Sequence, residues 1–197
     1  ELGAIHHVQI ACQSYLPEWR PGTNYRESYS ARADEGGVLR DLIHEIDYAA
    51  WLFGWPTAVR AQLGNTGRLG IAAEEWADVS WQAPNAASVS IHLDYLTRPA
   101  RRVMRAYGEH GTLELDLIKQ NVTHLRVGQP STTAQLTQDR DDMMADQARA
   151  FLAAIDGGNP GVLATLDDGA RALAICDAAR ESAQTHAVTA VRDWRSA

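Results

Sequence analysis

One short stretch of the sequence gathers side chains that could do acid–base chemistry around His44. Three and four residues to either side of it lie a guanidinium, two carboxylates and a phenol, at Arg40, Asp41, Asp47 and Tyr48. On a helix this spacing places all of them on one face. A histidine titrates near neutral pH and can take a proton from a substrate hydroxyl, while a carboxylate one turn away can fix its tautomer. The spacing indicates Asp41 as the partner of His44, and the alternative is a surface histidine between two solvated carboxylates.

The element that must position these residues is a helix over 38–53. Its apolar residues recur at helical spacing: Leu39, Leu42, Ile43, Ile46, Ala50 and Phe53. The glycines at 36 and 37 allow a tight turn into the helix, and Gly54 before Trp55-Pro56 supplies a stop signal. We therefore expect both ends of this helix to be defined.

Other kinds of site fit the sequence less well. Tyr48 stands where a zincin helix needs its second histidine. His6 and His7 would point to opposite faces of a strand, so at most one could join His44 in a mixed metal site, and no metal is predicted. The Gly-x-Ser-x-Gly motif of hydrolases is missing from the sequence. The glycines of 64–70 are spaced by threes and lack the strand, glycine loop and helix order of a dinucleotide fold, so no cofactor-binding residue is predicted in this chain.

Composition narrows the class of protein. The chain has 197 residues, 45% of them hydrophobic, and a net charge of -7, which argues against nucleic acid or an anionic membrane as a partner. Cys12 and Cys176 make a poor disulfide framework, and neither a membrane-spanning run nor a secretory leader is evident, so we expect reduced thiols and a cytoplasmic protein. The start at Glu1 rather than Met suggests a fragment of something longer.

The periodicities predict one α+β domain over 1–197. Its sheet is open, mostly antiparallel and of about six or seven strands, with helices packed on one face. The expected strands are 5–11, 57–63, 77–83, 87–95, 101–107, 112–117 and 123–127, with a possible edge strand at 188–192. A helix over 140–156 carries the stripe Met144, Ala148, Phe151 and Ile155, which we expect to pack on the core, and a capping box at 165–168 starts a second helix reaching about 184.

Residues 12–35 are expected to form a long ordered loop rich in aromatic and arginine side chains. Those that suit a sugar ring or a phosphate are Tyr15, Trp19, Arg20, Tyr25 and Tyr29. A loop of this length in a compact domain is more often functional than idle. The alternative is that the aromatic rings fasten the loop to the core.

The stretch 36–54 resembles the signature helix of the C-terminal domain of the glucose-fructose oxidoreductase, inositol dehydrogenase and rhizopine catabolism (Gfo/Idh/MocA) family. Three further segments agree with it: 2–5 resembles the run into the first sheet strand, 108–113 a turn within the sheet, and 168–183 the last helix. Together they span nearly the whole chain, and the signature helix is the specific part.

The resemblance implies the C-terminal half of a two-domain oxidoreductase that uses NAD or NADP. The Rossmann domain, with its glycine loop and a catalytic lysine in a Glu-Lys-Pro motif, would hold most of the cofactor and is missing from this chain; Lys119 does not match that motif. The catalytic roles carry over to Asp41 and His44. Here the histidine follows the aspartate by three residues, where many members have four, and Arg40 occupies the more usual aspartate position.

The activity implied is hydride transfer at a secondary alcohol of a sugar, a sugar derivative or a polyol. His44 would accept the hydroxyl proton and Asp41 would hold His44. Arg40, Asp47 and the aromatic and arginine residues of the loop would bind the substrate. The isolated chain is expected to be inactive and to form a homodimer or larger assembly through the sheet face. The alternative is a non-catalytic ligand-binding or dimerisation module.

Overall fold

Nine strands form one mixed sheet in the computed structural model, which describes residues 2–85, 87–159 and 161–196 and so leaves Glu1 outside the described residues. The strands are β1 Ile5–Gln13, β2 Ala58–Gly64, β3 Trp76–Gln82, β4 Ser88–Asp94, β5 Arg101–Gly108, β6 Gly111–Asp116, β7 Asn121–Arg126, β8 Thr132–Gln135 and β9 Thr189–Ala190. The helices are α1 Val38–Asp41, α2 Ile43–Phe53, α3 Arg140–Ile155 and α4 Leu166–Thr185.

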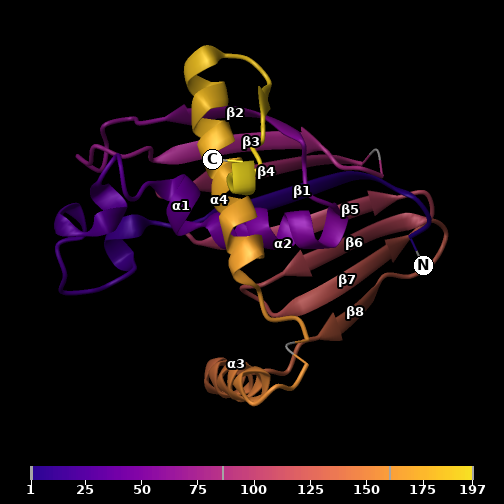
Figure 1. The fold of residues 1–197 in the computed structure, drawn as a ribbon. Helices are drawn as coiled ribbons and strands as arrows, with labels where there is room; N and C mark the ends of the chain where they lie inside the picture. Colours follow the sequence, from indigo (N-terminus) through magenta and orange to yellow (C-terminus); the bar gives the residue numbers. More distant parts are fainter. Residues whose placement is uncertain (1, 86, 160, 197) are drawn as a thin grey trace.

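The sheet has the order β8-β7-β6-β5-β1-β4-β3-β2-β9, so the first strand lies at its centre (Figure 1). Within the described part of the chain, β1 and β4 are parallel and the other pairings are antiparallel. The prediction of an open, mostly antiparallel sheet is confirmed. All seven expected strands are present, the possible edge strand is the short β9, and β8 was not predicted.

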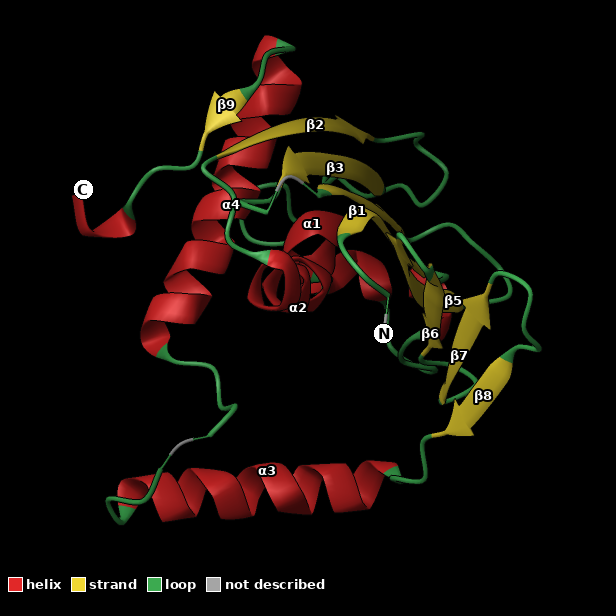
Figure 2. Cartoon of the chain, turned by 90° about the vertical axis from the view of Figure 1, so that its right-hand side faces the viewer, coloured by secondary structure: helices red, strands yellow, loops and turns green. Residues whose placement is uncertain are grey.

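One face of the sheet carries the core. On β1, Val8, Ile10 and Cys12 alternate with more exposed residues, and the register sets Val8 beside Val89 and Ile10 beside Ile91. Helices α2 and α4 cover this face, with α4 crossing the strands and packed against β2 (Figures 1 and 2). The expected helices on one face of an α+β sheet are therefore found.

Helix α4 begins with the predicted capping box. The Thr165 hydroxyl accepts a hydrogen bond from the Asp168 backbone N–H, and the Asp168 carboxylate accepts one from the Thr165 N–H. Further along α4, the buried Ser182 hydroxyl accepts from the backbone N–H of Ala61 at 3.0 Å. These contacts tie α4 to β2.

The prediction of one helix over 38–53 is wrong at Leu42, where φ is −103° and ψ is 25° and the chain divides into α1 and α2. In a continuous helix, Asp41 and Glu45 would lie one above the other on one face. Here Asp41 reaches Tyr95, directly after β4, and Glu45 reaches Arg102 on β5. We attribute the break to these two separate attachments, which local periodicity does not report.

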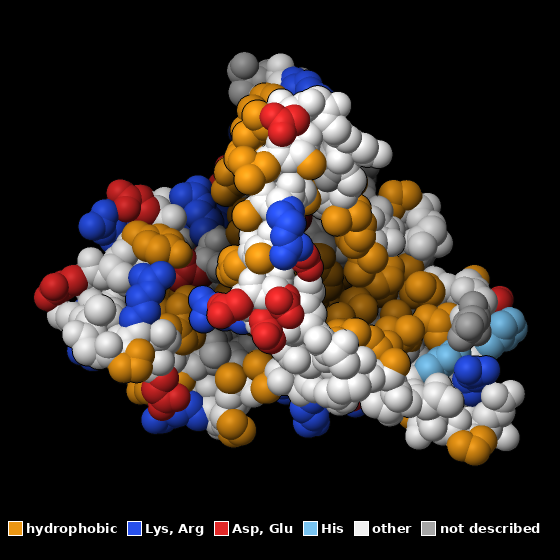
Figure 3. Space-filling model, turned by 90° about the horizontal axis from the view of Figure 1, so that it is seen from below, with side chains coloured by type: hydrophobic (Ala, Val, Ile, Leu, Met, Phe, Trp, Pro, Cys, Tyr) orange, Lys and Arg blue, Asp and Glu red, His pale blue; other side chains and the backbone are white. Residues whose placement is uncertain are grey.

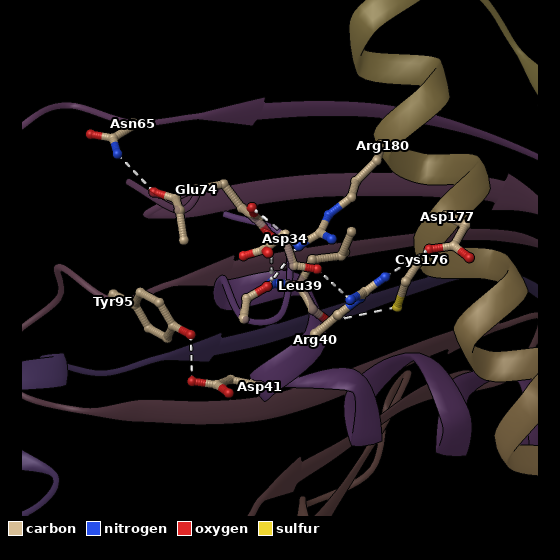
Figure 4. Close-up of polar contacts among 12 residues, drawn as sticks. Asp34, Leu39, Arg40, Asp41, Asn65, Glu74, Tyr95, Cys176, Asp177 and Arg180 are labelled. Atoms are coloured by element: carbon tan, nitrogen blue, oxygen red, sulfur yellow. Dashed lines mark hydrogen bonds and ion pairs between the residues drawn. The ribbon is translucent and has the colours of Figure 1, made fainter. Parts of the chain in front are cut away.

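The two glycines before α1 make the expected tight turn. Gly37 has φ +88°, and a Cβ added there would come within 2.2 Å of a Glu74 carboxylate oxygen. Arg180 on α4 donates to that carboxylate at 3.0 Å and to the Gly36 carbonyl at 2.6 Å (Figure 4). The start of α1 is thus fixed from both the β2–β3 connection and α4.

The long loop after β1 is ordered by three short 3-10 turns, at Leu16–Glu18, Tyr25–Glu27 and Tyr29–Ala31. The Trp19 ring meets the buried Tyr95 ring edge-on with centroids 5.4 Å apart, and the Tyr25 hydroxyl donates to the Leu69 carbonyl at 3.0 Å. For these two residues the structure shows the alternative considered above, aromatic rings that fasten the loop.

The glycine-containing turn at 64–70 is built around the fully buried side chain of Glu75. Its carboxylate accepts from the backbone N–H groups of Thr66 at 2.6 Å and Leu69 at 2.8 Å, and from the Thr66 hydroxyl. The Leu69 carbonyl accepts hydrogen bonds from Tyr25 and, at 2.8 Å, from Arg26. The glycine-containing turn therefore also positions the long loop.

Helix α3 corrects a prediction. It stands away from the sheet (Figure 2), and none of its residues is buried. Phe151 is 59% exposed and Ile155 64% exposed, so the stripe expected to pack on the core does not do so within this chain. Figure 3 views the molecule from below, the side on which α3 lies in Figure 1, and shows hydrophobic side chains gathered over this face. Helical spacing predicts which residues share a face, but it cannot tell what covers that face.

The opposite face of the sheet is polar and carries no helix in the described residues. A shallow hollow of about 380 Å³ lies on it, lined mainly by polar side chains such as Gln9, Ser90 and His92. His92 lies between Asp78, 2.7 Å from Nδ1, and Asp94, 3.2 Å from Nε2. In the parts of the chain that the structure describes, each helix falls short of the length or apolarity needed to cross a membrane.

Candidate active site

His44 lies near the start of α2, and its side chain keeps 47% of its surface exposed. The next residue, Glu45, is fully buried, and its Oε1 lies 3.3 Å from His44 Nε2. Arg102 from β5 donates to the same oxygen from Nε at 2.7 Å and from a terminal guanidinium nitrogen at 2.6 Å. A half-exposed imidazole therefore rests against a buried carboxylate that is held by a partly exposed guanidinium.

Burial lowers the pKa of His44 below its usual value. Glu45 opposes this effect, Arg102 adds to it, and the more distant Asp41 and Asp47 raise the pKa again. The net result is an imidazole that is neutral at neutral pH and able to accept a proton.

Asp41 has a different partner from the one expected. The hydroxyl of the fully buried Tyr95 donates to Asp41 Oδ2 at 2.5 Å (Figure 4). A hydrogen bond to Asp41 also raises the pKa of Tyr29. The structure thus pairs Asp41 with two tyrosines and His44 with Glu45, so the expected Asp41–His44 hydrogen bond does not form.

Arg40 is engaged in holding α1 in place. It donates to the Asp34 carbonyl at 2.7 Å and to the Asp177 carboxylate on α4 at 3.2 Å (Figure 4). Asp47 is partly buried on α2, and burial together with Asp168 at the start of α4 raises its pKa. The predicted substrate contacts of these two residues stay predictions.

The aromatic and arginine residues of the loop divide into two groups. Trp19 and Tyr25 are fastened to the core as described above, and the Tyr15 ring lies 3.9 Å beneath the Arg98 guanidinium. Arg20 is exposed and Tyr29 is 47% exposed, and Arg20 lowers the pKa of Tyr29, which places the two side chains near each other. A hollow of about 400 Å³ lies against this loop, with Trp19, Arg20 and Tyr25 in its wall.

Sequence reasoning missed Glu45, Arg102 and Tyr95. A signal for Glu45 exists in the sequence, since it lies between Leu42 and Ala49 on an otherwise apolar face of the helix. A carboxylate at such a position needs a buried partner. Nothing local identifies that partner as Arg102, which lies 57 residues further along the chain.

Comparison of the sequence with protein families matches residues 1–114 to the GFO/IDH/MocA C-terminal domain. The chain belongs to this family. The matched region contains α1, α2, the long loop and Arg102, so every residue of the candidate site lies in the family's domain. No curated protein matches the chain.

Solved structures of similar fold agree with this assignment. A levoglucosan dehydrogenase in complex with NADH and L-sorbose has a TM-score of 0.83 and 19% identity, over 98% of this chain and 60% of its own. The WlbA dehydrogenase from Bordetella pertussis, in complex with NADH and UDP-GlcNAcA, has a TM-score of 0.75 and 19% identity, over 97% of this chain and 56% of its own. The aldose-aldose oxidoreductase from Caulobacter crescentus has a TM-score of 0.77 and 18% identity, over 96% and 56%.

At these identities the likeness shows the fold of this GFO/IDH/MocA domain. The chain spans about three fifths or less of the length of these structures. The rest of each solved structure lies outside the part that this chain matches.

Proposed function

We propose that this GFO/IDH/MocA domain is the substrate-binding and catalytic half of an oxidoreductase that transfers hydride at a secondary alcohol of a sugar, sugar derivative or polyol. The observation that carries the proposal is His44, a half-exposed imidazole of lowered pKa against a buried carboxylate, in a domain of this family. Support for the substrate class comes from relatives solved with L-sorbose and with UDP-GlcNAcA.

The residues fit one end of the cofactor, NAD or NADP. Beside the nicotinamide, the hydroxyl on the reacting carbon needs a proton acceptor, which His44 offers. The glycine-containing turn at 64–70 does not fit the phosphates, because the N–H groups of Thr66 and Leu69 already bind the Glu75 carboxylate. The phosphates would therefore be held by a nucleotide-binding domain outside this chain.

In the proposed reaction the substrate hydroxyl gives its proton to His44 while its carbon loses a hydride. The bound cofactor supplies the hydride acceptor. A lowered pKa keeps His44 neutral before the transfer, and Glu45 stabilises the imidazolium that forms. Arg20 and Tyr29 are the exposed loop residues that would contact substrate hydroxyls.

The test is His44→Ala in the complete enzyme. We expect kcat to fall by roughly 10²-fold or more, the usual size for loss of a general base. His110→Ala, in the exposed turn between β5 and β6, is the matched control and should leave kcat unchanged. An unchanged kcat in His44→Ala would refute the role. The 197-residue chain alone should show no turnover and no tight NADH binding, and micromolar affinity in a fluorescence titration would contradict the division between domains.

The uncovered polar face of the sheet favours a second, compatible function as an assembly surface. A homodimer through this face would shelter its polar side chains, among them His92 and Asp78. Light scattering should give at least twice the monomer mass, and a monomer mass would count against it. If His44→Ala had no effect on turnover, a non-catalytic module that binds a ligand or dimerises would be the better description.

A further inference from the structure

The ion pair beneath His44 is unusual for the core of a domain. Glu45 is fully buried, and Arg102 places two nitrogens on its Oε1, at 2.7 and 2.6 Å. Taking a carboxylate out of water costs several kcal/mol, roughly the gain from its attraction to Arg102, whose side chain keeps 35% of its surface exposed, so the pair is weak evidence of stabilisation. A role beyond stability would explain why the core contains it.

The carboxylate has a second neighbour, since His44 Nε2 lies 3.3 Å from that same Oε1. Oε1 is thus the point on which the guanidinium and the imidazole converge. The hydroxyl of Tyr48, one turn along α2, also lies beside Glu45, and burial and this carboxylate raise its pKa. Arg102 donates to Oε1, and the imidazole nitrogen lies beside the same oxygen.

The charged groups that shift the pKa of His44 come from three elements. They are Asp41 on α1, Glu45 and Asp47 on α2, and Arg102 on β5. Cys12 on β1 lies close enough for its sulfur, a His44 nitrogen and a Glu45 oxygen to fall within 4.8 Å of one another.

Cys12, His44 and Glu45 are residue types that bind metal ions, but the contacts of Glu45 favour a hydrogen-bonding role. Arg102 already occupies Glu45 Oε1 with a full positive charge. The described residues therefore favour a carboxylate that receives a proton donor over one that binds a cation.

We propose that Glu45, held by Arg102, is the positioning residue of His44: it keeps the proton on Nε2 and leaves Nδ1 as the atom that accepts the substrate proton. This inference rests on the proposed function. The O–H bond of the substrate breaks, a new N–H bond forms at Nδ1, and the hydride leaves for the nicotinamide. The imidazolium would then keep its Nε2–H beside Glu45 Oε1, the oxygen to which Arg102 also donates.

The direct test is an NMR titration of the imidazole nitrogens in the 197-residue chain. At a pH above the pKa of His44, we expect the tautomer with hydrogen on Nε2. Glu45→Gln should lower that pKa further and Arg102→Met should raise it, since the carboxylate favours the charged ring and the guanidinium opposes it. Arg101→Met is the matched control, because Arg101 precedes Arg102 on β5 and points to the opposite, open face. A hydrogen on Nδ1, or a pKa unchanged in Glu45→Gln, would overturn the proposal.

The second test is a double-mutant cycle in the complete enzyme, with circular dichroism to confirm folding. Glu45→Gln should lower kcat about 10-fold or more and leave KM nearly unchanged, because it acts through the base rather than on the substrate. In the His44→Ala background it should cause no further loss. If His44→Ala lowers kcat but the two losses multiply, Glu45 does not act through His44 and this inference fails alone. If His44→Ala has no effect, the proposed function fails with it.

Discussion

Replacing the buried carboxylate of Glu75 tests how the long loop is positioned. The Glu75 side chain has no exposed surface, and its two oxygens serve the backbone N–H groups of Thr66 and Leu69 and the Thr66 hydroxyl. In Glu75→Gln one oxygen becomes an NH₂ group, so a donor faces a donor in the turn. A buried donor left unsatisfied, together with a lost charge-assisted hydrogen bond, costs about 3 kcal/mol. For a chain of this size that corresponds to a Tm lower by about 6–12 °C.

Urea unfolding of the 197-residue chain measures this loss of stability. The direction in which the loss changes with pH follows from the pKa of Glu75. Burial raises the pKa of Glu75, but the hydrogen bonds from Thr66 and from backbone N–H groups outweigh it and hold the pKa below its usual value. The stabilisation is therefore complete above the usual glutamate pKa and disappears as the pH falls through the lowered one. The difference between wild type and Glu75→Gln should be full at pH 7 and should become smaller as the pH falls below the usual glutamate pKa.

The control and the structural readout follow from the same contacts. Glu35→Gln, which removes an exposed ion pair with Arg32, should cost less than about 1 kcal/mol. Hydrogen exchange should increase in 16–31 in Glu75→Gln, because the Leu69 carbonyl holds Tyr25 and Arg26. If Glu75→Gln cost no more than Glu35→Gln, or if its cost were the same at pH 3 and pH 7, the assignment of Glu75 as the organiser of this turn would be refuted.

Two further predictions concern His92 and Asp41. Hydrogen bonds to Asp94 and Asp78 raise the pKa of His92 to about 9, so its stabilisation is complete below its usual pKa and is lost as the pH rises through 9. With the side chain 39% exposed, solvent screening reduces this to about 1 kcal/mol, which His92→Gln should remove from the urea stability at pH 6 but not at pH 10. Tyr95→Phe deprives Asp41 of a buried donor and should cost about 2 kcal/mol, against less than half as much for Tyr107→Phe, whose hydroxyl donates to the exposed Gln9. Equal costs for the two tyrosines would contradict the assigned contact of Asp41.

Most of the sheet could be predicted from the sequence because its signals are local. Alternation fixes Val8, Ile10 and Cys12 on one face of β1, and the box at 165–168 fixes the start of α4. Helix α3 shows the limit of such signals. Its apolar stripe has the right period, but helical spacing does not report what covers that face, and the described parts of the chain leave the stripe unburied.

The candidate site was predicted in the same uneven way. His44 and the acidic residues around it follow from spacing, whereas Arg102 lies on β5 and Tyr95 directly after β4, which only the tertiary fold brings near. The choice of Asp41 as partner assumed an unbroken helix. The break at Leu42 places Asp41 on α1 and His44 on α2, and Asp41 accepts a hydrogen bond from Tyr95.

The break at Leu42 separates two tasks that a continuous helix would have placed on one face. Asp41 ends α1 and is bound to Tyr95 and Tyr29, so its charge acts on the core beneath the loop and on the exposed ring at the loop's end. Glu45 lies on α2 and serves His44 and Arg102. The Tyr95 hydroxyl occupies Asp41 Oδ2, whereas the imidazole of His44 lies against Glu45 Oε1. Within the proposed reaction, we therefore assign the orientation of the base to Glu45 and the placement of Tyr29 to Asp41.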